Sequence, residues 1–376
     1  MKTTGDQQLV KRINRSVLLR LLRTQPGLSR ARLSQQSGLT KSTVSALVRE
    51  LLDENWLSEA DEPVAATGRG RPSTPLHING ALRVLVGVEI GVQQIRLVCV
   101  SLTGEVLASA QQALSNTQAR HVSGQAAAMV RRAWKDLARD KLQLSGLGFC
   151  LPGAIDETLG VVRFAPNLGW RDVKFLSLLG DALARCGVPS GEVHLHNDAD
   201  AAALGEYEFA ASDDAGPLIF VNCDEGVGAG IVLNDRLFTG ARGMAGEIGH
   251  STMQVDGASC SCGRLGCAET FIGARTMGTA EGVQRAAHYL GVLVQNLDVM
   301  FNPRVVVVGG ASCSNHPGLL AGAVRTVADY ARRAGVPAPE IRGARYGLQA
   351  AAVGAAAVAL HHYLRPMHVK SVLEPA

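Results

Sequence analysis

Three cysteines and one histidine form the cluster of residues best suited to chemistry in this chain of 376 residues. Cys260, Cys262 and Cys267 stand close together, and His250 precedes them by ten positions, with two glycines inside the cysteine run. Three thiolates and one imidazole complete a tetrahedral zinc site and leave no position for water, so the sequence predicts a structural Zn²⁺ ion. The alternative is a group of buried thiols without a metal, but the other five of the eight cysteines are dispersed.

Polar residues near this cluster predict a site for a polyol. A histidine that binds zinc through one ring nitrogen presents the other as a fixed N–H donor, and Glu247 and Glu269 stand beside His250 and Cys267 as acceptors. Asn197 and Asp198 follow an expected strand and supply further hydrogen-bonding groups, with Asp198 as an acceptor or general base. The alternative for Asn197 and Asp198 is a helix cap, which is the more frequent role of such a pair.

Positive charge is concentrated at the N-terminal end of the chain. Residues 1–80 hold 12 Lys and Arg against 7 Asp and Glu, whereas the remaining residues hold 25 against 26. A small basic module ahead of a nearly neutral body predicts a polyanionic partner.

The basic module has the pattern of a winged helix-turn-helix. Apolar residues recur at helical spacing from Ile13 onward. Ser29 and Thr40 are the expected N-caps of the second and third helices, and Gly38 lies in the turn between them. The third helix is then the recognition helix in the major groove of double-stranded DNA. Its candidate DNA-binding residues are Lys41, Ser42, Thr43, Ser45 and Arg49. The alternative is a helical dimerisation domain with solvated basic residues.

The segment after the third helix predicts a wing. Residues 67–75 are rich in Gly, Pro and Arg, and Arg69 and Arg71 are candidates for the minor groove. The alternative is a flexible linker.

The body of the chain predicts an α/β fold of two related lobes. A pair of strands with an intervening turn begins near Val84 and recurs near Leu218, and an Ala-rich helix over residues 348–364 packs back on an earlier lobe. No signal peptide or membrane span is legible, and the cysteines are too sparse for a disulfide framework, so a cytoplasmic protein is expected.

These motifs together resemble the ROK family of repressors and sugar kinases. The likeness rests on the His250 and cysteine cluster, on Gly246-Glu247, on the run that starts at Asn197 and on residues 166–170. The resemblance implies an actin-like or ribonuclease-H-like pair of α/β lobes behind a winged helix-turn-helix. It also implies zinc at His250, Cys260, Cys262 and Cys267. The implied sugar-binding residues are Asn197, Asp198, Glu247, His250 and Glu269. The expected parts are residues 1–80 (DNA-binding domain with linker), 81–200 completed by the helix in 348–376 (first lobe), and 201–347 (second lobe with zinc).

The phosphate-binding loops depart from the pattern of the family's kinases. Kinases that it resembles begin the first lobe with Asp-x-Gly-Gly-Thr-Lys, where this chain has the sequence from Glu89 to Gln94, and they carry Gly-Thr-Gly where this chain has Asp224-Glu225-Gly226. Carboxylates close to a triphosphate repel it by about 1–4 kcal/mol per pair. We therefore expect no catalytic residue, although Asp198 matches the kinase base, and we expect it to bind sugar.

The sequence thus predicts a sugar-responsive DNA-binding regulator, most simply a repressor. Its expected partners are a double-stranded operator, a monosaccharide or sugar phosphate, and further copies of itself in a homodimer or homotetramer. The alternatives are an ATP-dependent sugar kinase with a DNA-binding module and a zinc-stabilised scaffold without a small ligand.

Overall fold

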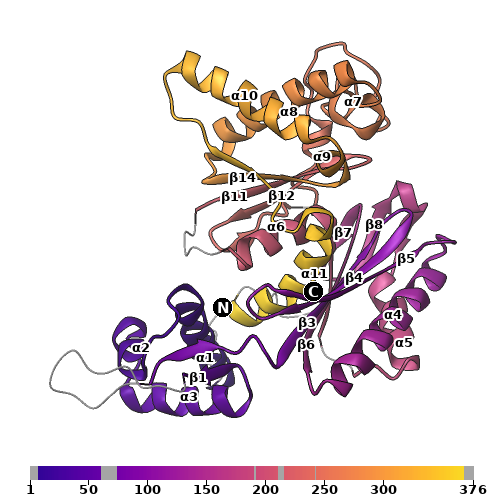
Figure 1. Cartoon of the computed structure of the whole chain (residues 1–376). Coiled ribbons are helices and arrows are strands. Elements are labelled where there is room, and N and C mark those ends of the chain that lie inside the picture. The colour runs from indigo at the N-terminus through magenta and orange to yellow at the C-terminus, as the bar shows by residue number, and fades with distance from the viewer. Residues whose placement is uncertain (1–6, 61–73, 190–191, 211–215, 242, 368–376) are drawn as a thin grey trace.

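The computed structural model describes residues 7–60, 74–189, 192–210, 216–241 and 243–367. Two α/β lobes lie one beyond the other, and a small helical domain at the N-terminus packs beside the first of them (Figure 1). The last helix, α11 (Ala350–Leu364), runs among all three parts. Within the described residues, no helix is long and apolar enough to cross a membrane.

The described residues of the N-terminal domain form three helices and a two-stranded sheet. These elements are α1 (Gln7–Thr24), α2 (Arg30–Ser37), α3 (Lys41–Asp53), β1 (Leu57–Glu59) and β2 (Leu76–Ile78). The expected caps are confirmed, because the side-chain oxygens of Ser29 and Thr40 accept hydrogen bonds from the first turns of α2 and α3, and Gly38 ends α2 at φ +72°. β1 and β2 flank residues 61–73, so the proposed wing with Arg69 and Arg71 lies outside the described residues.

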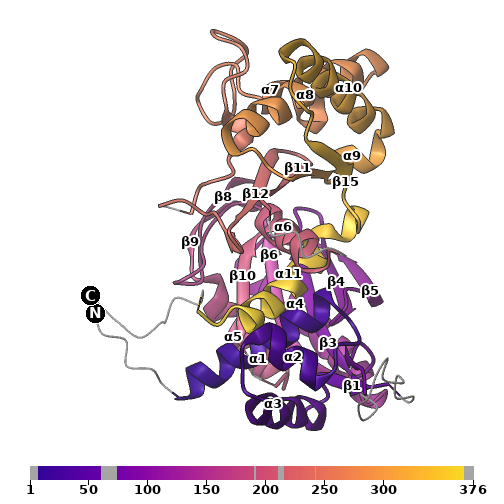
Figure 2. The ribbon, with the colours of Figure 1, turned by 90° about the vertical axis from the view of Figure 1, so that its left-hand side faces the viewer.

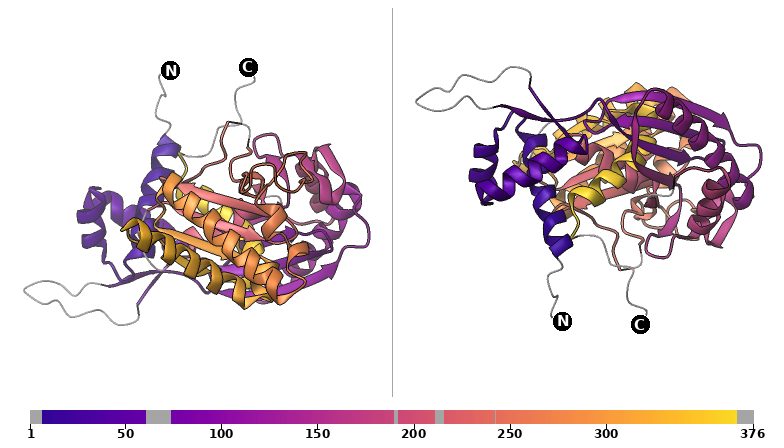
Figure 3. Two further views of the ribbon diagram at one scale, coloured as in Figure 1. Left: turned by 90° about the horizontal axis from the view of Figure 1, so that it is seen from above. Right: turned by 90° about the horizontal axis from the view of Figure 1, so that it is seen from below.

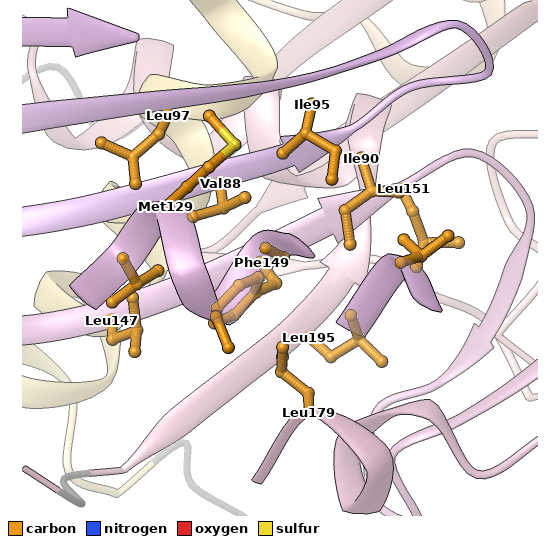
Figure 4. Packing of buried hydrophobic residues seen from close by; sticks show 14 of the residues in the cluster. Val88, Ile90, Ile95, Leu97, Met129, Leu147, Phe149, Leu151, Leu179 and Leu195 are labelled. Atoms are coloured by element: carbon orange, nitrogen blue, oxygen red, sulfur yellow. The ribbon is translucent and has the colours of Figure 1, made fainter. Parts of the chain in front are cut away.

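The first lobe is built on a five-stranded sheet in the order β10-β6-β3-β4-β5. Its strands are β3 (Arg83–Ile90), β4 (Gln94–Ser101), β5 (Val106–Ala113), β6 (Gln143–Leu151) and β10 (Val193–Asn197). Helices α4 (Ala119–Arg139) and α5 (Phe175–Arg185) cover one face, where side chains such as Phe149 and Leu179 are fully buried (Figure 4). A small second sheet holds β7 (Ala154–Asp156), β8 (Val161–Ala165) and β9 (Trp170–Val173).

Helix α11 covers the other face of this sheet at very short range. A Cβ on Gly87 would lie 1.9 Å from the carbonyl oxygen of Ala352, and one on Gly148 would lie 1.8 Å from that of Ala355. The absence of side chains at these two glycines therefore lets α11 rest directly on the backbone of β3 and β6.

The second lobe repeats the arrangement of the first. Its strands are β11 (Leu218–Cys223), β12 (Val227–Leu233), β13 (Arg236–Leu237), β14 (Val305–Gly309) and β15 (Glu340–Gly343). Their order, β13-β12-β11-β14-β15, corresponds to the order β5-β4-β3-β6-β10 in the first sheet. In each lobe the central strand pairs antiparallel with the next strand of the chain and parallel with a later one. The predicted duplication is confirmed.

Helices cover both faces of the second sheet. They are α6 (Asp198–Glu208), α7 (Glu269–Ile272), α8 (Ala280–Phe301), α9 (Ala311–Asn315) and α10 (Pro317–Ala334). Helices α8 and α10 pack on each other on the outer side, and α6 packs between the sheet and α11. Short 3₁₀ turns occur at Pro166–Leu168, Ile248–His250, Ala274–Thr276 and Gly347–Gln349.

The N-terminal domain shares a hydrophobic core with the body. Leu18, Leu22 and Leu51 belong to the same buried cluster as residues of β3, β4 and α11, and α1 lies against α11 (Figure 2). The ring of Trp56 stacks on Tyr363 of α11 with centroids 4.1 Å apart. The domain therefore lies to one side of the two lobes (Figure 3) as a packed part of the molecule.

Candidate functional site

The predicted zinc ligands lie close enough together to hold one ion. One ligand atom from each of His250, Cys260, Cys262 and Cys267 lies within 4.8 Å of all the others. The Cys260 sulfur is 3.7 Å from Nδ1 of His250, and the Cys262 and Cys267 sulfurs are also 3.7 Å apart. Zn–S bonds of about 2.3 Å in a tetrahedron separate two sulfurs by nearly 3.8 Å, so the four residues fit a four-coordinate metal.

The cluster is positioned by close packing of its loop against β12. Gly246, at φ +93°, precedes the 3₁₀ turn that carries His250, and a Cβ there would lie 1.9 Å from the carbonyl oxygen of Ala229. The amide of Ala229 in turn donates to the carbonyl of Gly246, at 2.7 Å. With Nδ1 of His250 facing the thiols, Nε2 lies 4.0 Å from a carboxylate oxygen of Glu247, whose side chain is exposed.

Glu269 and the start of α6 lie against the same strand. The amide of Val227 in β12 donates to the Glu269 carboxylate at 3.2 Å. A Cβ on Gly230, also in β12, would lie 2.2 Å from the carbonyl oxygen of Ala199. Strand β12 therefore lies beside the His250 and cysteine cluster, Glu269 and the first turn of α6.

Asn197 acts as the cap of α6. Its side-chain oxygen accepts hydrogen bonds from the amides of Ala199 and Asp200, at 2.8 and 3.2 Å, and its amide donates to the carbonyl of Gly153 at 3.0 Å. The helix-cap alternative drawn from the sequence thus describes Asn197, and the remaining capacity of its side chain toward a ligand is small.

The surroundings of Asp198 strongly shift the pKa of its carboxyl group. Burial, followed by the neighbouring charge of Glu89, raises its pKa to about 7. One carboxylate oxygen accepts the amide of Ala199 at 2.9 Å, and the other faces the side-chain amide of Asn222 at 3.4 Å. Asp200, two residues further along α6, is also buried, and one of its carboxylate oxygens has no hydrogen-bond partner among the described residues. Burial raises the pKa of Asp200 as well.

An ion pair lies at a small cavity that residues of both lobes line. Arg96 donates to both oxygens of Glu89 at 3.0 Å, and burial raises the pKa of Glu89 against the opposing charge of Arg96. Glu89, Arg96 and Asp224 line one small cavity of about 20 Å³. Asp224 is partly buried and faces this cavity, whereas Glu225 is exposed.

Helix α3 presents a polar face to solvent opposite its buried apolar residues. Lys41, Ser45 and Arg49 are exposed at successive helical turns, and Val44 and Leu51 are fully buried on the other side. The hydroxyls of Ser42 and Thr43 both lie 2.9 Å from that of Thr40, inside the capping turn. Of the five candidate DNA-binding residues on α3, Lys41, Ser45 and Arg49 are therefore exposed outside the cap, and Ser42 and Thr43 take part in it.

Sequence reasoning missed a buried charge cluster that joins α1 to α6. Glu208, the last residue of α6, contacts Arg23 at 2.6 Å, Nδ1 of His361 at 2.6 Å, and Arg365. Burial alone raises the pKa of Glu208, but the charge of Arg23 and the contacts with His361 and Arg365 hold it well below its usual range. Each of these partners lies more than 150 positions from Glu208 in the sequence, so no local sequence pattern predicts the contacts.

Comparisons with known proteins identify the class to which this chain belongs. A profile of the ROK family matches residues 85–279 and 274–362, and a profile of the IclR helix-turn-helix domain matches residues 16–61. The chain is therefore a member of the ROK family that carries a helix-turn-helix domain.

Three similar proteins are named as repressors or as a transcriptional regulator. The chain is 28% identical to the xylose repressor of Bacillus subtilis, with 96% of this chain and 98% of that protein covered. It is 30% identical to a putative xylose repressor of a Caldicellulosiruptor species, with 81% and 84% covered. It is 28% identical to the DNA-binding transcriptional dual regulator NagC of Escherichia coli, with 71% and 64% covered.

Solved structures show the same fold with and without the N-terminal domain. A ROK-family transcriptional regulator described as a homologue of the Escherichia coli MLC protein superposes with a TM-score of 0.75 at 23% identity, covering 95% of this chain and 97% of that one. A ROK hexokinase from Thermus thermophilus superposes with a TM-score of 0.61 at 28% identity, covering 76% and 100%. The two-lobe fold predicted from the sequence is confirmed.

Proposed function

We propose that this protein is a sugar-responsive DNA-binding repressor. One observation carries the proposal: α6 begins at Asn197 and Asp198 in the expected sugar site and ends at Glu208, which pairs with Arg23 of the DNA-binding domain. Relatives named xylose repressor and NagC support the same conclusion. The helix has 11 residues, so its two ends are about 16 Å apart.

The ligand is a monosaccharide or a derivative of one, such as its phosphate. Asp198, Glu247, His250 and Glu269 supply the hydrogen-bonding groups for its hydroxyls, and Asn197 holds the backbone from which Asp198 projects. His250, Cys260, Cys262 and Cys267 hold a zinc ion that supplies structural cross-linking. With Nδ1 directed to the metal, the Nε2–H of His250 remains as an oriented donor for the sugar.

DNA is bound through α3. Lys41 neutralises a phosphate, and Ser42, Thr43, Ser45 and Arg49 lie near base edges, with the side chains of Arg69 and Arg71 in the minor groove. Two or four copies of the chain place two such helices on half-sites about one helical turn apart. Movement of α6 upon sugar binding changes the position of α1 and therefore the spacing of the helices. Since its partner is an operator in DNA, we propose that the protein acts in the cytoplasm.

We further propose that the protein does not phosphorylate its sugar. The Glu89 and Arg96 pair and Asp224 line a cavity of only about 20 Å³. By resemblance to the family's kinases, the loops that carry Glu89 and Asp224 correspond to their phosphate-binding loops, so this small, charged cavity supports the proposal. We also propose three domains: a DNA-binding domain with its linker in residues 1–80, a first lobe in 81–200 completed by the C-terminal helix, and a second lobe in 201–347.

Thermal unfolding of the zinc-loaded protein with monosaccharides, their phosphates and ATP tests the ligand. A ligand that binds only the folded state raises the midpoint. We expect one sugar or sugar derivative to do so and ATP to have no effect. A midpoint that rises with ATP, together with sugar-dependent ADP formation in a coupled assay, would establish the kinase alternative instead.

Operator binding is tested with Arg49→Ala and a matched control, Arg333→Ala, whose side chain is exposed on α10 far along the chain from α3. Operator fragments are first selected from random duplexes with the full-length protein. Arg49→Ala should weaken their binding while the sugar-induced rise of the midpoint persists. Equal binding by both variants would contradict the assignment of α3.

A further inference from the structure

A cavity of about 390 Å³ lies where the DNA-binding domain meets both lobes, at the opposite end of α6 from the expected sugar site. Five arginines line it, and they come from segments far apart in the sequence. These are Arg20, Arg23, Arg304, Arg345 and Arg365. The carboxylates of its lining are those of Glu208 and Asp235, so the described lining residues carry a net charge of +3.

The two carboxylates are already engaged by protein groups. Glu208 has 1% of its side chain exposed and contacts Arg23, Arg365 and His361. Asp235 pairs with Arg20 at 3.1 Å and accepts the hydroxyl of Tyr207. They therefore have little capacity left to balance the charge of Arg345.

Two of the arginines retain donors that suit an external anion. The guanidinium of Arg345 donates to the carbonyl oxygen of Phe209 at 2.6 Å, which is a neutral acceptor, and its side chain is exposed. Arg365 is 92% buried, with 8% exposed, and its Nε has no hydrogen-bond partner among the described residues. A buried donor without an acceptor is costly, and a small movement of the Arg365 side chain toward an oxyanion in the cavity removes that cost.

We propose that this cavity binds a small phosphorylated organic molecule. Guanidinium groups match the oxygens of a phosphate in paired hydrogen bonds. Leu22, Leu102 and Phe209 add an apolar wall for a carbon skeleton, and the volume lies in the range of small-molecule sites. Because α1 supplies Arg20 and Arg23 while the other arginines belong to the body, the bound phosphate cross-links the DNA-binding domain to the lobes.

Calorimetric titration of the full-length, zinc-loaded protein with glycerol 3-phosphate tests the site. This probe is an organic phosphate without a sugar ring, with glycerol as its neutral control and constant ionic strength throughout. We expect one saturable site per chain for the wild type and for the control Arg333→Gln. Loss of one arginine contact should weaken binding about tenfold or more in Arg345→Gln.

A second variant, Arg304→Gln, keeps the test independent of any structural role of Arg345, and unfolding midpoints verify that both variants are folded. Hydrogen exchange of the α1 amides should slow with glycerol 3-phosphate and stay unchanged with glycerol. Absence of saturable heat in the wild type, or equal affinities for both variants and the control, would overturn the proposal. Neither result bears on sugar or operator binding, which are measured without the phosphate.

Discussion

Replacement of Arg23 by Met should release the DNA-binding domain from the body in a measurable fraction of molecules. The Arg23 guanidinium lies 2.6 Å from Glu208, and their side chains are 18% and 1% exposed. A hydrogen bond to a charged group contributes about 1.5–3 kcal/mol. Glu208 keeps Arg365 and His361 as partners, so the larger cost of an uncompensated buried charge does not arise. We expect a loss of about 2 kcal/mol, which raises the open population roughly 30-fold.

Arg20 provides the matched control for this change. It belongs to the same helix but is 45% exposed, and it pairs with the partly exposed Asp235 at 3.1 Å. Such pairs contribute about 0–1 kcal/mol, so Arg20→Met should change the opening free energy by less than half as much.

The assay is native-state hydrogen exchange of the α1 amides, which reports the free energy of local opening. A double-mutant cycle with Glu208→Gln isolates the contribution of the pair, and we expect a coupling of about 1–2 kcal/mol between Arg23 and Glu208. Equal effects of Arg20→Met and Arg23→Met, or a coupling near zero, would refute the role assigned to Glu208.

Three further predictions concern the metal, the packing and the pH response. Cys262→Ser should lose bound zinc and the response to sugar, with metal content as the measurement and Cys313→Ser as a control that keeps both. Gly230→Ala places a Cβ 2.2 Å from a carbonyl oxygen of α6, so it should lower the midpoint of urea unfolding, whereas Gly124→Ala, with open space around it in α4, should be neutral or slightly stabilising. Burial lowers the pKa of His194 from 6.5 to about 4. Between these two pH values, His194 is therefore protonated in the unfolded chain and neutral in the folded chain. The free energy of unfolding should therefore fall between about pH 7 and pH 4, by up to about 3 kcal/mol from this residue, and His194→Gln should flatten that slope.

Local chemistry made much of the molecule predictable from its sequence. The cysteine cluster, the caps at Ser29 and Thr40, and the duplicated strand pattern depend on residues close together in the chain, and the structure contains each of them. Periodicity and spacing therefore sufficed for the elements and for the clustering of His250 with the three cysteines.

The contacts that connect the parts were not predictable in this way. Glu208 lies in an Ala-rich helix whose sequence gives no sign of a partner, and Arg23 reads as one of many basic residues of the first helix. Their pairing depends on the packing of α1, α6 and α11, which places residues from both ends of the chain around one carboxylate. Likewise, Arg96 becomes the partner of Glu89 only because β3 and β4 pair in the observed register.

The position of α11 after all the other described elements has a consequence for biosynthesis. N-terminal domains of many proteins fold while the rest of the chain is still being made. Here the apolar faces of β3 and of α1 belong to a cluster that also contains Ala352, Leu360 and Leu364, and these residues emerge from the ribosome after all the other described helices and strands. A nascent chain, or one that lacks α11, therefore exposes these faces, whereas a chain that includes α11 buries them. Premature termination would thus produce a polypeptide that depends on chaperones, and not a free DNA-binding domain acting without control.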